Sequence, residues 1–134
     1  MPDGYASRIV LTDSIVANSL GGDCHNVVTD GGHNISSDDT CGFDPANHSM
    51  PSTDPVLGPL QDNGGPTWTH ALLEGSPAID VGDDAQCPAT DQRGVLRPLD
   101  GNGDGEAVCD IGAYEVNPEA LTRQLFLPIA VRSH

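Results

Sequence analysis

Glycine and proline occur so often along this chain that long helices are excluded. There are 16 Gly and 11 Pro among 134 residues, about a fifth of the total. Glycine disfavours helix interiors because of its backbone entropy, and proline because it lacks an N–H and clashes with the preceding turn. The apolar residues instead form short β-branched runs between polar corners. We therefore expect an all-β chain and exclude a helical bundle.

The charge balance excludes two classes of partner. Twenty acidic residues stand against five basic residues, all of them Arg, which gives a formal net charge of -15. A chain this acidic repels nucleic acid and anionic membrane surfaces. Only 37% of the residues are hydrophobic and 4% are aromatic, and low hydrophobicity with high net charge is also typical of disordered chains. Because the core must be small, we expect additional interactions to stabilise the fold.

The four cysteines fall into two local couples that can supply this stability. Cys24 and Cys41 are 17 positions apart, and Cys87 and Cys109 are 22 positions apart. No C-x-x-C motif or zinc-finger histidine spacing is present, which argues against a structural zinc site. We predict two local disulfides, each stabilising the fold by roughly 3 kcal/mol in the chain-entropy model. The alternative is four reduced, buried thiols.

Disulfides indicate an oxidising compartment, so we expect an extracellular or cell-surface location. Residues 1–4 show neither a basic region nor an apolar run typical of a secretion signal, and we expect the chain to be the tail of a longer secreted protein. No apolar run approaches the ~20 residues that a membrane-spanning helix requires.

The N-terminal third is organised like the rungs of a solenoid. Short β-branched runs in residues 8–19, 27–29 and 34–36 are separated by Gly-Gly pairs and polar corners. This spacing favours one or two coils of a parallel β-helix over a long-stranded sandwich. A solenoid repeat cannot bury its apolar face alone, so these coils should rest on preceding ones. We also expect short strands at residues 95–98 and 108–114.

Several motifs in one order resemble the choice-of-anchor Q domain, the C-terminal region of many secreted bacterial right-handed parallel β-helix proteins. The likeness covers roughly residues 8–116. Its motifs are LTDSIVAN (residues 11–18), DPVLGPLQDNGGPT (54–67), THALLEGSPAIDVGD (69–83), CPATDQRG (87–94), RP (97–98) and CDIGAYE (109–115).

The resemblance implies an all-β fold in which terminal coils of a right-handed parallel β-helix are followed by an irregular, loop-rich, disulfide-stapled cap. We expect the coils in residues 1–45, the cap in 46–116 and a C-terminal tail with an edge strand in 117–134. The implied role is that of an adhesin-like surface module. Family members carry varied anchoring tails after the final Glu, and the tail here matches no sortase pattern.

The tail contains the most apolar stretch of the chain. Pro128 confines that stretch to a sheet edge or a chain terminus, and an exposed edge invites pairing with another chain. We therefore predict an assembly edge formed by Leu125, Phe126, Leu127, Ile129 and Val131.

The segment DGNGDG (residues 100–105) has the alternating spacing of a calcium loop. Oxygen ligands at alternate positions with Gly at the bend suit a hard cation. An EF-hand would need a Glu at its twelfth position, where this chain has Ile111, so the loop is not an EF-hand. The predicted calcium ligands are Asp100, Asn102, Asp104, Glu106 through its backbone carbonyl, and Asp110. The alternative is an acidic turn without metal.

A second group of charged residues could have a structural or a chemical role. It contains Asp80, Asp83, Asp84, Asp91, Arg93 and Arg97. Paired carboxylates can act on sugars or bind metal, but Asp–Arg pairs that position the cap are the favoured interpretation. If Asp80 or Asp110 is buried, it needs hydrogen-bonding partners such as Arg93 or Arg97.

These observations favour a non-enzymatic structural module that terminates a parallel β-helix on a bacterial surface protein. The alternative is a subunit that self-assembles into an extracellular filament or layer through strand-edge pairing. A fragment of a polysaccharide-degrading enzyme is disfavoured, because the chain is short and has few aromatic residues to stack on sugars. The expected partners are preceding coils or neighbouring copies, with a surface glycan or protein as a further ligand.

Overall fold

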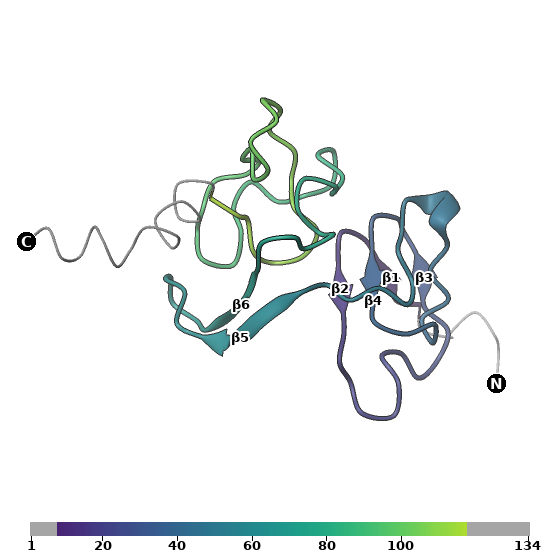
Figure 1. Ribbon diagram of the computed structural model, residues 1–134. Coiled ribbons are helices and arrows are strands. Elements are labelled where there is room, and N and C mark those ends of the chain that lie inside the picture. Colours follow the sequence, from purple (N-terminus) through teal and green to yellow (C-terminus); the bar gives the residue numbers. More distant parts are fainter. Residues whose placement is uncertain (1–7, 118–134) are drawn as a thin grey trace, which may run out of the picture.

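The computed structural model describes residues 8–117, and these residues are mostly short strands and turns (Figure 1). One 3-10 turn is the only helical element among them. The elements in chain order are β1 (Val10–Leu11), β2 (Ile15–Val16), β3 (Thr29–Asp30), β4 (Ile35–Ser36), η2 (Pro45–Asn47), β5 (Leu57–Gln61) and β6 (Thr69–Leu72). Over residues 8–117, this secondary structure is consistent with the predicted all-β fold. Within residues 8–117, no helix has the length and apolar character needed to span a membrane.

Residues 9–53, which we call the ladder unit, run three times through the same place in parallel register. Strands β1 and β3 pair in parallel, as do β2 and β4, and a single parallel bridge joins Ile35 to Met50. The chain returns to the Ile15 position after 20 residues at Ile35 and after 15 more at Met50. Each sheet has only two strands, so these residues alone do not constitute a parallel β-helix.

Equivalent positions of the three passes form columns. The apolar column is Ile15, Ile35 and Met50, and the residues before them form a polar column of Ser14, Asn34 and Ser49. In the polar column, the N–H of each of the first two residues donates to the side-chain oxygen of the next. One position earlier, each pass turns through a left-handed residue: Asp13, His33 and His48 have φ angles of 51°, 56° and 62°.

The remaining chain forms a hairpin and a long irregular segment. Strands β5 and β6 are antiparallel, and residues 73–117, which we call the loop region, contain no strand apart from an isolated bridge between Thr90 and Leu96. The strands expected at residues 95–98 and 108–114 are therefore wrong. The reason is that side-chain carboxylates replace strand partners for some backbone N–H groups there. The Val95 N–H donates to the Asp91 carboxylate, and the Asp110 N–H donates to the Glu115 carboxylate.

The core lies between the ladder unit and the loop region. Ile35 and Leu72 pack there against Ala78, Ile111 and Val116 of the loop region, and all five are at most 3% exposed. Burying a Leu or Ile side chain stabilises a fold by roughly 1.5–3 kcal/mol. A core this small leaves a large share of the stability to other interactions.

Both predicted disulfides are present. Cys24–Cys41 joins the loop after β2 to the loop after β4, with the Cα atoms 4.9 Å apart. Cys87–Cys109 closes a segment of the loop region, with the Cα atoms 6.6 Å apart. Each region of the molecule therefore has one covalent link of its own.

Candidate functional site

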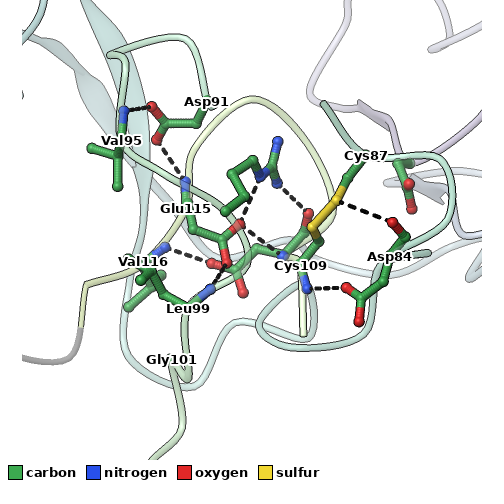
Figure 2. A network of polar contacts seen from close by, with 12 residues as sticks. Asp84, Cys87, Asp91, Val95, Leu99, Gly101, Cys109, Glu115 and Val116 are labelled. Atoms are coloured by element: carbon green, nitrogen blue, oxygen red, sulfur yellow. Dashed lines mark hydrogen bonds and ion pairs between the residues drawn. A yellow bond between two sulfur atoms is a disulfide. The ribbon is translucent and has the colours of Figure 1, made fainter. Parts of the chain in front are cut away.

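The loop region is organised around acidic side chains that lie inside it. Glu115 is fully buried, and its carboxylate pairs with the Arg97 guanidinium at 2.8 Å. The same carboxylate accepts hydrogen bonds from the Leu99 and Asp110 N–H groups. Figure 2 shows Glu115 and Asp91 lying together, with the N–H groups of Leu99 and Val95 directed at their carboxylates.

Asp91 forms the second centre of this network. Its carboxylate pairs with Arg93 at 2.9 Å and accepts the N–H groups of Glu115 and Val95. Burial acts to raise the pKa of Asp91, but these hydrogen bonds and the Arg93 guanidinium outweigh it, so the pKa is lowered and the carboxylate is ionised. Arg93 also lies over the Tyr114 ring, 3.7 Å from its centroid, which is a cation–π contact.

Asp110 is a fully buried carboxyl without an arginine on its side chain. Its oxygens accept the N–H groups of Asp80 and Val116, whereas Arg97 donates to its backbone carbonyl. Burial raises the pKa of Asp110 to about 7, with a further contribution from the neighbouring charge of Glu115. The predicted Asp–Arg pairing thus holds for Asp91 with Arg93, while Arg97 pairs with Glu115 and the Asp110 carboxylate is held by backbone.

The acidic loop brings three carboxylates to one place. Oxygens of Asp80, Asp100 and Asp104 lie within 4.8 Å of one another. Asp80 accepts the N–H groups of Gly101 and Asn102 at 3.0 and 2.9 Å, which fixes the loop against the rest of the region. Since like charges at this separation repel, a cation between them would be favourable.

Within the acidic loop, Asp100 accepts the N–H groups of Gly103, Asp104 and Gly105. The N–H of Asp104 also donates to Asn102, and the N–H of Glu106 donates to Asp104. These bonds hold residues 100–106 in a tight turn.

The structure places two of the predicted residues differently. Asp110 is not one of the three clustered carboxylates, and its side chain accepts the Val116 N–H in the core. Asp80, expected to be structural, is a member of the cluster. The approach depends on Gly101, where an added Cβ would lie 2.9 Å from Ile79 Cγ2 and 3.2 Å from Asp80 Oδ1.

The sequence does not by itself single out two of the carboxylates that matter in the structure. Glu115 ends the CDIGAYE motif, and a lone acid among apolar neighbours is the one signal there of a buried ion pair. Asp30 accepts hydrogen bonds from the Asp44 N–H, the Ser49 hydroxyl and the Asn34 amide. Burial acts to raise the pKa of Asp30, but these bonds outweigh it and the pKa is lowered.

The predicted assembly edge (Leu125 to Val131) and almost all of the predicted tail lie outside the described residues. A scan against protein-family models finds no match to this sequence, and searches of curated proteins and of solved structures find no match either. Functional inference therefore depends on the geometry and on the motifs of the sequence.

Proposed function

We propose that this chain is a non-enzymatic, extracellular module that terminates a parallel β-helix on a bacterial surface protein, as its resemblance to the choice-of-anchor Q domain implies. The observation that carries the proposal is the set of columns in the ladder unit. A parallel register shared by three passes, with apolar, polar and left-handed positions each aligned, is the local pattern of a solenoid. Further coils could continue the same columns.

The contacts of the loop region support a terminating role. Its residues 81–83 run beside the left-handed corners of the ladder unit: His33 Nδ1 lies 3.0 Å from the Val81 carbonyl oxygen, and the Asp83 N–H donates to Asp13 at 2.7 Å. Ile111 packs against Ile35 in the core. The loop region thus covers the apolar column of the passes, which a solenoid repeat cannot bury alone. The two disulfides agree with an oxidising location.

An added coil tests this proposal directly. Because Ile15 and Ile35 are 20 residues apart in register, a copy of residues 9–28 inserted before Ile9 supplies one coil, with Cys24 of the copy changed to Ser. The control carries a Gly/Ser segment of equal length. We expect the added coil to protect the Val10 N–H from hydrogen exchange by roughly tenfold over the control. Equal exchange in the two proteins would contradict the proposal.

We also propose that the acidic loop binds calcium through Asp80, Asp100, Asn102 and Asp104, with the Glu106 carbonyl as a further ligand. The proximity of three carboxylates within 4.8 Å supports this role, and oxygen-only ligands favour a hard cation. A cation bound only by the folded state raises the melting temperature. We expect calcium to raise it by several degrees over chelator, and Asp104→Ala to abolish the shift while Glu106→Gln keeps it. If calcium does not change the melting temperature of the parent protein, the proposed calcium site is wrong.

The self-assembly alternative rests on one structural observation, the exposure of Ile9 and Val10 at 58% and 57% beside an open strand edge. The net charge of -15 on every copy opposes it. Sedimentation at increasing protein and salt concentration distinguishes the two functions, since assembly predicts growing polymers and capping predicts a constant mass.

A further inference from the structure

On the side away from the second pass, strand β2 of the first pass has no strand partner among the described residues. In a parallel pair, alternate residues of a strand bond to the neighbour on one side. The carbonyl of Ser14 accepts the Ile35 N–H at 2.9 Å, and that of Val16 accepts the Ser37 N–H at 3.3 Å. The N–H and C=O of Ile15 therefore face the opposite side, where no described residue bonds to them.

A groove of about 1100 Å³ lies along this edge. Every ladder-unit residue that lines it belongs to the first pass, between residues 12 and 18, and none belongs to the second or third pass. The opposite walls come from the hairpin, through Leu57 and His70, and from the loop region, through Gln92, Ala113 and Tyr114. Figure 1 agrees, because β2 lies on the side of β4 that is nearer to β6 and the loop region.

We propose that this groove binds the coil that precedes β1, so that the loop region contacts that coil as well as the passes of the ladder unit. This inference rests on the proposed function. The incoming segment adds to the edge as a parallel strand and bonds to the Ile15 N–H and C=O. Continuity with the existing ladder identifies the occupant, because the groove has an unpaired strand edge on one side and the three aligned columns end at that edge.

The columns specify the chemistry of this coil. It presents an apolar residue over Ile15 and a small hydroxyl or amide residue over Ser14. At the corner the pattern changes, because the Gly112 N–H already donates to the Asp13 carbonyl at 2.9 Å. At this corner the Gly112 N–H therefore takes the Asp13 carbonyl in place of an N–H of the incoming coil. We expect the column of left-handed residues to end at Asp13. A second copy of this chain is a poorer occupant, since two bodies of charge -15 repel each other.

The added-coil protein described above tests the groove when a wall residue is changed. Ala113 is exposed and lines the groove, so Ala113→Trp fills the groove from the loop-region side, and Ala113→Ser is the matched small control. In the added-coil protein, we expect the Ile15 N–H to exchange roughly tenfold more slowly than in the Gly/Ser control. Ala113→Trp should remove this protection, and Ala113→Ser should keep it.

The outcomes separate the two proposals. If the added coil protects Val10 but not Ile15, or if Ala113→Trp leaves the Ile15 protection intact, the groove does not bind the coil and the inference falls, while the capping function stands. If neither amide gains protection, the capping function fails as well. If the original chain sediments as a dimer with Ile15 already protected, a second copy is the occupant and the inference is overturned. The melting temperature of Ala113→Trp without the coil should equal that of the parent.

Discussion

The ladder unit and the loop region satisfy their backbone hydrogen bonds in different ways. In the ladder unit, the strands of successive passes bond backbone to backbone in a repeating register. Carboxylates accept backbone N–H groups in both regions, as Asp30 does from Asp44 in the ladder unit. In the loop region they take the place of strand pairing, and two of these acids, Asp110 and Glu115, are fully buried. A repeating register tolerates many side chains, whereas a carboxylate network depends on single residues. We therefore expect the loop region to be the more easily broken half.

The substitution Glu115→Ala tests most strongly whether the loop region depends on single carboxylates. The substitution leaves the Nε–H of the 3%-exposed Arg97 side chain and the N–H of Leu99 without an acceptor. Removing one partner of a buried pair costs about 3–5 kcal/mol. We expect that loss in urea unfolding, together with faster hydrogen exchange at Leu99 before any change at Val16. The control is Glu106→Ala, because Glu106 is exposed, and its effect should be within about 0.5 kcal/mol. Equal stability of the two variants would contradict the network.

The disulfides provide a test in which the two regions should behave alike. They close segments of similar length, 17 and 22 residues, so the chain-entropy model gives each about 3 kcal/mol. We expect Cys24→Ser with Cys41→Ser, and separately Cys87→Ser with Cys109→Ser, to lower the unfolding free energy by similar amounts. A much larger loss for the second pair would mean that the loop region depends on its link as well as on its carboxylates. Mass spectrometry of unreduced peptides checks the pairing itself.

Asn34→Ala tests whether the ladder unit has a single-residue dependence of its own. Asn34 is fully buried, accepts the Ser14 N–H and donates to the Leu11 carbonyl at 2.7 Å. Leaving such groups unpaired costs about 1–3 kcal/mol, so we expect a loss of about 2 kcal/mol in urea unfolding. Asn26→Ala is the exposed control. A loss as large as that of Glu115→Ala would show that the two regions are equally fragile.

The same contrast explains what the sequence could predict. The strand positions at Ile15 and Ile35 and the two cysteine pairs depend on residues close in sequence or on a repeated pattern. Local spacing carries that information. The Asp91–Arg93 pair is also local, since the two residues are two positions apart.

The rest of the site depends on contacts that no local pattern records. Asp80 reaches the acidic loop across 21 positions, and it does so because Gly101 has no side chain to keep it away. Val95 looks like a strand residue by propensity, but its N–H is taken by the Asp91 carboxylate. Carboxylates that replace backbone partners override β propensity, and only the tertiary structure shows which ones do so.

The smallest predicted effect is a pH dependence whose sign depends on the individual carboxyl group. Burial raises the pKa of Asp13 in the ladder unit, whereas the burial of Asp91 in the loop region is outweighed by hydrogen bonds that lower its pKa. In the ladder unit, hydrogen bonds outweigh burial and lower the pKa values of Asp23 and Asp30, so their contribution is present above the unfolded pKa and lost on acidification. In the loop region, burial raises the pKa of Asp110 to about 7. Its contribution is complete below the unfolded pKa near 3.8 and is lost as the pH rises toward 7.

The measurement is the unfolding free energy between pH 4 and 7. One titrating proton changes it by at most about 1.4 kcal/mol per pH unit, and we expect the parent protein to lose stability over this interval at less than that slope. Asp110→Asn cannot titrate, so its slope should be flatter even if its stability is lower throughout. An unchanged slope would mean that Asp110 is already ionised at pH 4. Asp110 would then titrate in the same direction as Asp23, Asp30 and Asp91, whose pKa values are lowered, and the contrast between the two regions would be one of geometry alone.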